Sequence, residues 1–255
     1  MRVAIIVASH KPYWMPEDDI YIPLQVGSVD RPPIAGFRRD DAGEQISARN
    51  PSFCELTGLY WAWKNMEADY IGLVHYRRHF AGAFRFDKKL RVAERKTIEH
   101  ALSRADVILP AKRRYFVETN YSHYIHAHHE QDLTLTRNIL EERWPDYLPA
   151  WDSVMRRRSG HRFNICVMKK PLLNAYASWL FDVLFTLEHR LDTSGYTGLD
   201  ARVFGLVSER LLDIWLARNP VRTVELPIVN LEPQHWPKKI AAFLRRKFKP
   251  RGTRK

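Results

Sequence analysis

Short apolar runs alternate with amphipathic helical stretches along this chain, and this alternation constrains its fold more than any other feature. The runs expected to be strands are residues 2–9 (RVAIIVAS), 70–74 (YIGLV), 106–110 (DVILP), 162–168 (RFNICVM) and 221–228. The stretches expected to be helices are residues 51–66, 96–104, 132–143, 171–190 and 203–219, and the proline-rich residues 12–37 are expected to form an irregular loop. Buried strands that alternate with helices indicate an α/β domain with a mostly parallel central sheet flanked by helices.

Polar and cationic side chains directly follow three of the expected strands. His10 and Lys11 follow the first strand, HYRRH begins at His75 at the end of the second, and KRR begins at Lys112 after the third. Ligands bind beyond the carboxyl ends of parallel strands, so we expect these groups to converge on one rim. Such a rim suits a phosphorylated ligand, because Arg offers a two-pronged donor and Lys a compact charge. The alternative is that these cations are solvated strand ends.

Several other classes of protein are not supported by the sequence. It contains no GxGxxG, GxxxxGK[ST] or GxSxG motif, as dinucleotide-binding, P-loop and serine-hydrolase sites would require. Cys54 and Cys166 lie in apolar runs without ligand spacing and are expected to be reduced, buried thiols. The apolar run at residues 3–8 is too short for an export signal, and no run approaches the roughly 18–20 residues that span a bilayer. We therefore expect a chain that is soluble or lies on a membrane surface.

The formal net charge of +12 is concentrated at the end of the chain. Residues 238–255 hold nine basic and no acidic residues, which leaves +3 (12 − 9) for the rest. Ile240, Phe243, Leu244 and Phe248 share one face of a helix. We therefore expect residues 231–255 to be a basic amphipathic tail that binds an anionic membrane surface. Its expected membrane-binding residues are Trp236, Lys238, Lys239, Phe243, Arg245, Arg246, Lys247 and Phe248. The alternatives are a solvated basic tail and a tail that binds nucleic acid.

Long blocks of the sequence resemble one bacterial family. The blocks are ISARNPSFCELTGLYWAWKN, DYIGLVHYRRHF, DVILPAKRRYFVE, HYIHAHHEQDL, FNICVMKK and WLFDVLFTLEHR, in this order. They resemble the family known as domain of unknown function 4422, which accompanies capsule and O-antigen synthesis genes and includes galactofuranosyltransferases. The resemblance extends to about residue 219, and the chain departs from it at residues 43–47, where GEQIS replaces the usual GDNIS.

The resemblance implies what the chain does. It implies a single GT-A-like glycosyltransferase domain, here residues 1–230, that takes a sugar from a UDP-sugar donor. Galactofuranose is the first candidate for that sugar, and a glycan or lipid-linked glycan of a growing surface polysaccharide is the acceptor. The protein would then lie in the cytoplasm, peripheral on the inner face of the cytoplasmic membrane. No nucleic-acid partner is expected.

Most GT-A enzymes hold a divalent metal on the diphosphate with an Asp-x-Asp motif, and this chain has none. The segment at His75 occupies the place where that motif would stand. The expected donor- and diphosphate-binding residues are His10, Lys11, Tyr13, His75, Tyr76, Arg77, Arg78 and Asn164. Fixed cations can neutralise the charge that develops on the leaving group, so we expect metal-independent transfer without a cofactor. The alternative is a metal held by His75 with His79, or by His126 with His128.

An inverting transferase also needs a base that takes the proton of the acceptor hydroxyl. Asp200, in a glycine-rich loop before a helix, is the first candidate, and Glu209 on that helix is the second. The alternatives are that Asp200 caps the helix and that Glu209 pairs with Arg210. Two other classes of function remain open, namely a non-catalytic module that binds a nucleotide sugar or carbohydrate, and a nucleic-acid-binding protein.

Overall fold

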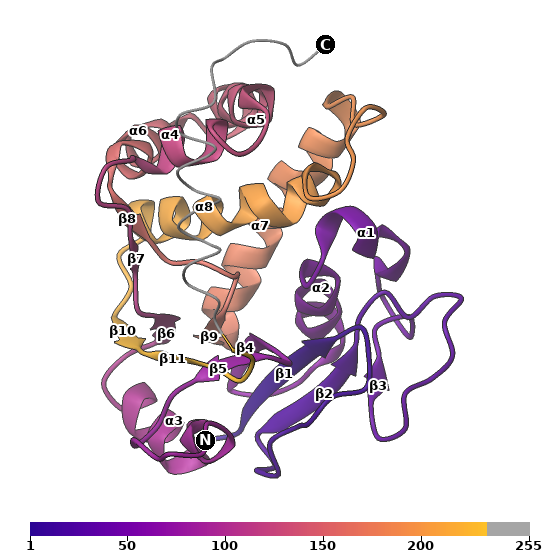
Figure 1. Cartoon of the computed structure of the whole chain (residues 1–255). Helices are drawn as coiled ribbons and strands as arrows, with labels where there is room; N and C mark the ends of the chain where they lie inside the picture. The colour runs from indigo at the N-terminus through magenta and orange to yellow at the C-terminus, as the bar shows by residue number, and fades with distance from the viewer. Residues whose placement is uncertain (234–255) are drawn as a thin grey trace.

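A mixed, mostly parallel sheet flanked by helices forms the centre of the molecule (Figure 1), which confirms the expected α/β fold. The computed structural model describes residues 1–233. The strand order is β10-β6-β9-β4-β1-β2-β3. These strands are β1 (Val3–Ser9), β2 (Tyr21–Gln25), β3 (Arg38–Arg39), β4 (Tyr70–His75), β6 (Val107–Pro110), β9 (Cys166–Lys169) and β10 (Thr223–Leu226). Beside this path, β5 (Arg78–Phe80) pairs with β4, and β11 (Ile228–Asn230) pairs with β5.

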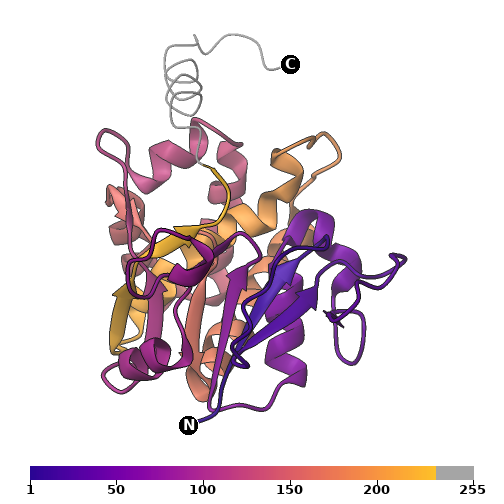
Figure 2. The same cartoon turned by 60° about the horizontal axis from the view of Figure 1, so that its bottom comes forward.

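The directions of the strands determine which of their carboxyl ends lie at the same edge of the sheet. β1 is parallel to β2 and β4, and β6 is parallel to β10. β9 is antiparallel to both of its neighbours, β4 and β6, so β4 and β6 run in the same direction. The carboxyl ends of β1, β4 and β6 therefore lie at one edge of the sheet, as Figure 2 shows for the neighbouring strands β1 and β4.

Helices cover both faces of the sheet, and β1 supplies side chains to both. Ile5 and Val7 belong to the core that includes residues of α3 (Arg95–Leu102). Ile6 and Ala8 belong to the core on the opposite face, because successive side chains of a strand point to opposite sides. That larger core is built by α2 (Leu56–Asn65), α5 (Glu130–Arg143), α6 (Leu148–Arg156), α7 (Lys170–Arg190) and α8 (Val203–Arg218). The short helices α1 (Asn50–Phe53) and α4 (Asn120–Ile125) each add one fully buried ring, Phe53 and Tyr124.

Three differences from the expected elements affect the site. The helix expected at residues 51–66 is divided into α1 and α2 by Cys54, whose φ is 54°. The strand expected at residues 162–168 begins only at Cys166, because Phe163 and Asn164 have left-handed φ values of 76° and 54°. The loop expected at residues 12–37 contains β2, which is ordered by parallel pairing with β1.

The tail expected to contact a membrane, from Trp236 to Phe248, lies outside the described residues. Within residues 1–233, none of the helices combines the length and the apolar character that a membrane span needs. The structure therefore describes the chain from Met1 to Pro233.

Candidate active site

The ends of β1 and β4 bring the first two cationic segments together. Ala8 of β1 is in register with His75 of β4, and the backbone N–H of Tyr76 donates to the carbonyl of Ala8 over 3.1 Å. The chain then turns at Tyr76 and Arg77, and it returns as β5 with Arg78 paired to His75. This tight turn places the side chains that follow β4 beside those that follow β1.

Aromatic contacts fix the segment after β1 against this turn. The rings of His10 and Tyr13 lie edge-on to Tyr76, with centroid separations of 5.5 and 4.8 Å. The ammonium of Lys11 lies 5.3 Å from the centroid of Tyr76 and 5.9 Å from that of Tyr13. Because aromatic faces attract cations, these rings hold the Lys11 charge at the end of the sheet.

A pocket of about 260 Å³ opens at this edge. The elements that form it are the carboxyl ends of β1 and β4, helix α1 with the break that follows it, and η4 (Asp200–Arg202), a short helical turn before α8. Its lining residues are Ala8, His10, Val26, Asn50, Pro51, Cys54, Glu55, His75, Tyr76, Arg77 and Arg202. We call it the first pocket.

Cations surround His10 at the border of this pocket. Burial lowers the pKa of His10, and the positive charges of Lys11, Arg31, Arg77 and Arg202 lower it further. His10 is therefore a neutral ring in a cationic environment. Fixed positive charges from four separate segments of the chain make this edge of the sheet suited to an anion with several charges.

A second, wider pocket of about 530 Å³ adjoins the first, and His10 lines both. Its other lining residues are Lys11, Pro12, Tyr13, Gln25, Arg31, Pro32, Pro33, Ile34, Ala35 and Phe37. Cationic side chains and a tyrosine thus stand beside an apolar wall of prolines, Ile34 and Phe37. Most ligand pockets combine apolar walls with a few placed polar groups in this way.

Glu55 carries the carboxyl group of the first pocket. It follows the break at Cys54, and its side chain is only 12% exposed. Its Oε1 accepts a hydrogen bond from Nδ2 of Asn164 over 2.7 Å and lies 3.7 Å from Nε2 of His75. Burial raises the pKa of Glu55, against the opposing effects of the Asn164 hydrogen bond and of Arg202 and Arg78.

His75 is held as a neutral hydrogen-bond donor in the wall of this pocket. Its Nε2 lies 2.7 Å from the carbonyl oxygen of Phe163, which can only accept. Burial and then the nearby charge of Arg78 lower the pKa of His75 to about 3. The imidazole therefore does not neutralise Glu55 by carrying a charge of its own.

The left-handed turn at Phe163 and Asn164 holds both His75 and Glu55. The backbone N–H of Phe163 donates to Oε1 of Glu209 over 3.0 Å. The amide of Asn164 also donates to the carbonyl of Gly205 and accepts from the hydroxyl of Ser208. Asn164 is 3% exposed, and its amide is occupied by these contacts. It lies behind Glu55 and positions it, whereas the sequence predicts a donor-binding role.

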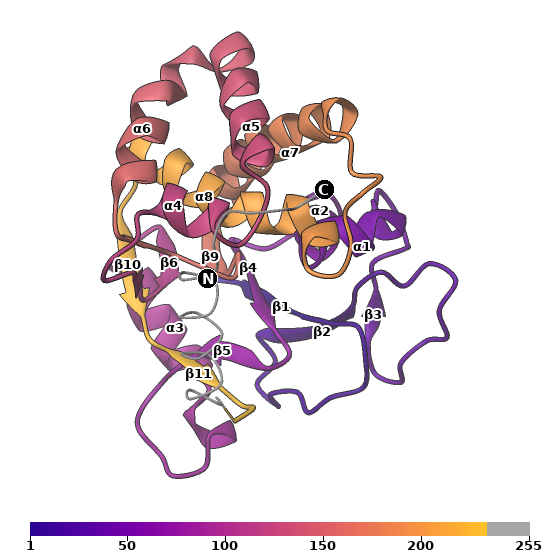
Figure 3. The ribbon, with the colours of Figure 1, turned by 45° about the horizontal axis from the view of Figure 1, so that its top comes forward.

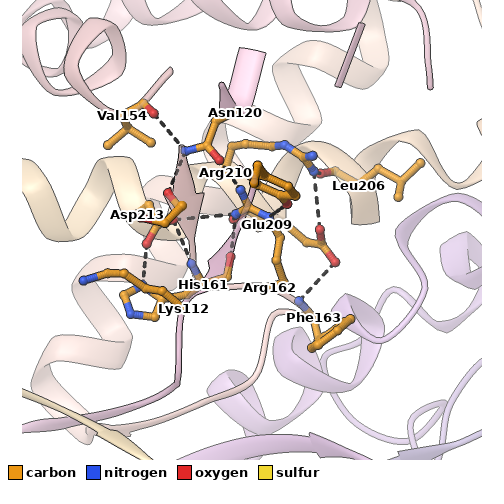
Figure 4. Close-up of polar contacts among 12 residues, drawn as sticks. Lys112, Asn120, Val154, His161, Arg162, Phe163, Leu206, Glu209, Arg210 and Asp213 are labelled. Carbon is orange, nitrogen blue, oxygen red and sulfur yellow. Dashed lines mark hydrogen bonds and ion pairs between the residues drawn. The ribbon is translucent and has the colours of Figure 1, made fainter. Parts of the chain in front are cut away.

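Glu209 belongs to a buried polar cluster between α8 and the segment before β9 (Figure 4). Its Oε2 lies 3.3 Å from Nη1 of Arg210, so the expected ion pair is present. Nη1 of Arg162 donates to the backbone carbonyl of Glu209, and Asp213 lies 3.6 Å from the same nitrogen. His161 in turn pairs with Asp213. These contacts fix the approach of the chain to the Phe163 turn.

Asp200 lies on η4 but does not line the first pocket. Its Oδ1 is 2.8 Å from Nδ1 of His128, and its Oδ2 is 3.4 Å from Nε2 of His129. It therefore joins the α4–α5 connection to η4, and no side-chain cap is present at the start of η4 or of α8. The neighbouring Arg202 does line the pocket, and its Nε contacts Sγ of Cys54 at 3.0 Å.

Several other predicted residues lie elsewhere than expected. Arg78 stacks over the ring of Phe163 at 4.4 Å and does not line the first pocket. His79 is fully buried, where the sequence predicts a rim residue. The cations after β6 do not join the rim, because β9 separates β6 from β4, and Lys112 pairs with Glu225 at 3.0 Å.

The histidines proposed as alternative metal ligands have separate partners. Nε2 of His79 bonds to the carbonyl of Tyr76, whereas His75 bonds to that of Phe163. His126 pairs with Glu118, and His128 pairs with Asp200. In the part of the chain that the structure describes, no three or more His, Cys, Asp or Glu side chains are grouped so that they could hold a metal.

Three charged residues of the two pockets, Glu55, Arg31 and Arg202, do not follow from the sequence pattern. The sequence pattern places Glu55 within a continuous helix, whereas the positive φ of Cys54 ends α1 just before it, and Glu55 lines the pocket. Arg31 belongs to the proline-rich loop, where no periodic pattern indicates its direction. Arg202 follows the predicted Asp200 by two residues on η4, and of the two it is Arg202 that lines the first pocket.

Comparison with solved structures gives a close match to a glycosyltransferase. The structure titled WbbM bifunctional glycosyltransferase, in its apo form, matches with a TM-score of 0.84 and 29% sequence identity. The match covers 91% of this chain and 46% of that one, so the present chain spans about half the length of the bifunctional protein.

Comparison with curated proteins gives no match. The model of one protein family, domain of unknown function 4422, matches residues 4–220. This range includes all the residues that line the first pocket, from Ala8 to Arg202. The resemblance read from the sequence blocks is thereby confirmed, and the chain belongs to the family of the domain of unknown function 4422.

Proposed function

We propose that this protein is a glycosyltransferase that takes a sugar from a UDP-sugar and adds it to a growing lipid-linked bacterial surface polysaccharide. The observation that carries the proposal is the ring of cations around His10, which adjoins a pocket with an apolar wall. The structural match to a glycosyltransferase, which covers 91% of this chain, supports sugar transfer as the reaction. Galactofuranose is the first candidate for the sugar, as the sequence resemblance implies.

The cations bind the diphosphate of the donor in this proposal. The charges of Lys11, Arg77, Arg31 and Arg202, from four segments of the chain, all act on His10. Arg side chains bind phosphate oxygens through two parallel hydrogen bonds. When the bond from the anomeric carbon to the diphosphate oxygen breaks, the negative charge on the leaving group increases. Fixed cations stabilise that charge without rearranging, so transfer proceeds without a metal.

Glu55 is the base in this proposal. The acceptor hydroxyl oxygen attacks the anomeric carbon as the bond to the diphosphate breaks, and the hydroxyl proton passes to Glu55. This single displacement inverts the anomeric centre. The raised pKa of a buried carboxyl makes it a better proton acceptor than an exposed one. Asp200 and Glu209, the candidates from the sequence, are the competing assignments, and their partners give them positioning roles.

The proposed cellular setting follows from the acceptor. Residues 1–230 act as the GT-A-like catalytic domain, and residues 231–255 attach it to the inner face of the cytoplasmic membrane. A lipid-linked glycan is presented at that surface, so a peripheral location brings the pocket to its acceptor.

A panel of UDP-sugars that includes UDP-galactofuranose tests the proposal. Binding is measured by calorimetry and transfer by product mass, each with and without EDTA. We expect micromolar to millimolar binding of one donor, slow hydrolysis without acceptor, and full turnover in EDTA. Binding without hydrolysis or transfer would identify a nucleotide-sugar-binding module instead. Strict dependence on added manganese would disprove metal-independent transfer, and binding of no donor would overturn the proposal.

A further inference from the structure

Residues 83–90 form a loop between β5 and α3 in which every residue is exposed. We call it the 83–90 loop, and Figure 3 shows it extending beyond the body of the sheet at the bottom of the view. Its large apolar side chains point into solvent, with exposed fractions of 68% for Phe84, 98% for Phe86 and 67% for Leu90. Of the seven large hydrophobic side chains exposed in residues 1–233, three lie in this one loop. Such a concentration marks an interaction surface.

Cations are interleaved with these apolar side chains. Arg85, Lys88, Lys89 and Arg91 against Asp87 give residues 83–91 a net charge of +3 (4 − 1). No carboxylate among the described residues forms an ion pair with any of the four cations. Their charges are therefore available to an anionic partner.

The apolar side chains gather into one group rather than scattering over the loop. The rings of Phe84 and Phe86 meet edge to face with centroids 5.9 Å apart. The guanidinium of Arg91 lies 4.9 Å from the centroid of Phe84. A cation beside an aromatic ring in this way can keep its charge in water while the ring enters an apolar layer.

The composition of the loop distinguishes between kinds of partner. The cores of protein–protein interfaces are depleted in Lys, and a side chain with 98% exposure does not belong to a packed groove. Phe and Leu mixed with Lys and Arg are instead typical of segments that lie in the headgroup region of an anionic bilayer. We propose that the 83–90 loop inserts Phe84, Phe86 and Leu90 into an anionic membrane surface while its cations contact lipid phosphates.

The loop is also placed beside the candidate active site. The ammonium of Lys89 lies 5.5 Å from the centroid of Trp14, which directly follows Tyr13 of the second pocket. At its other end the loop continues from β5, which begins at Arg78 next to the cationic turn. A membrane that receives this loop would therefore lie close to the pockets. This attachment is separate from that expected of the tail, and it does not depend on sugar transfer.

The test uses the full chain and sedimentation with vesicles. The vesicles contain equal parts of phosphatidylcholine and phosphatidylglycerol, with phosphatidylcholine alone as the uncharged comparison. We expect the combined variant Phe84→Ser, Phe86→Ser and Leu90→Ser to lower the partition coefficient on the anionic vesicles about 10-fold or more. The matched control is Phe116→Ser with Val117→Ser, which removes two exposed apolar side chains from a different loop and should leave binding unchanged.

Hydrogen exchange reports on the amides of the 83–90 loop directly, so it separates binding by this loop from binding by the tail. In the full wild-type chain, the amides of residues 83–90 should become protected on the anionic vesicles and stay unprotected with phosphatidylcholine alone. Unchanged vesicle binding by the triple variant, together with absent protection, would overturn the proposal. Protection that rises with protein concentration without vesicles would also overturn it, because the loop would then bind a second copy of the chain. Retained thermal unfolding confirms that the variants fold.

Discussion

Substitution of Glu55 distinguishes between Glu55 and Asp200 as the group that accepts the proton of the acceptor hydroxyl. Glu55→Gln removes the carboxylate of the first pocket and keeps its shape, so we expect kcat to fall about 10²- to 10⁴-fold with donor binding retained. Asp200→Asn should leave kcat within about 10-fold of the wild type, because its partners are His128 and His129. Steady-state kinetics and calorimetry of the two variants decide between them, with exposed Glu141→Gln as the control.

A larger loss of kcat in Asp200→Asn than in Glu55→Gln would instead identify Asp200 as the base.

The pH dependence of kcat/KM adds an independent check on Glu55. A base acts only when deprotonated, so kcat/KM should fall as pH drops through the raised pKa of Glu55. Glu55→Gln should lose this acid limb, whereas a purely structural role of Glu55 would leave the shape of the profile unchanged.

His79 makes the stability of the protein depend on pH. Burial lowers the pKa of His79 to about 4, so the ring stays neutral in the folded chain, while in the unfolded chain it protonates near the ordinary histidine pKa of about 6.5. Its stabilising contribution is complete above that value and is lost as pH falls toward the folded pKa. At pH 5 the loss amounts to about 2 kcal/mol for this residue.

Urea unfolding of His79→Gln at pH 7 and pH 5 measures this effect. The Gln amide can still donate to the carbonyl of Tyr76 but does not titrate. We expect the stability difference between wild type and variant to shrink as pH falls, because only the wild type loses stability through this site. The exposed His189→Gln is the control, and an equal pH dependence in wild type and His79→Gln would contradict the prediction.

At the scale of elements, β4 and β9 approach closely because Gly72 has no side chain. A Cβ at this position would lie 2.7 Å from Cγ2 of Val167 and 2.9 Å from the carbonyl oxygen of Cys166. We therefore expect Gly72→Ala to destabilise the fold by about 1–3 kcal/mol through overpacking. Gly195→Ala is the matched control, since nothing lies within 4 Å of its added Cβ. Denaturant unfolding measures both, and equal stabilities would show that the sheet adjusts without cost.

The sequence predicts elements well where a single pattern decides them. β1 and β4 follow from their continuous apolar runs, and α7 and α8 from their long helical periodicity. The composition of residues 21–25 does not predict β2, because this strand is ordered by its pairing with β1 in the tertiary structure. For the same reason the sequence does not predict that β9 is antiparallel and lies between β4 and β6, where it separates the cations that follow β6 from those that follow β4.

The sequence predicts the pocket residues that follow strands, but not those whose position depends on a local turn of the backbone. His10, Lys11, Tyr76 and Arg77 follow apolar strands, and sheet geometry brings such residues together whatever else the chain does. Glu55 depends on one left-handed residue in a stretch that reads as a continuous helix. Where a site depends on a single backbone dihedral, the local sequence pattern does not reveal it.

At the scale of the whole molecule, the charge is divided between the α/β domain and the tail. Removing residues 238–255 deletes nine cations, so we expect binding to anionic vesicles to fall at least about 10-fold. Binding should not vanish, since the 83–90 loop remains. Vesicle sedimentation and transfer to a soluble acceptor are measured on the shortened chain. Unchanged vesicle binding with lost binding of RNA or DNA would show that the tail contacts nucleic acid instead.

The position of β9 sets the order in which this protein can be assembled during synthesis. β9 lies between β4 and β6, which both leave the ribosome long before it. Until it arrives, the facing edges of β4 and β6 carry unpaired backbone groups that can pair with other chains, and this is the interval in which a chaperone would protect the nascent protein. The turn that holds His75 and Glu55 directly precedes β9. A chain released before residue 169 therefore lacks the strand between β4 and β6, and it also lacks Arg202, which lines the first pocket.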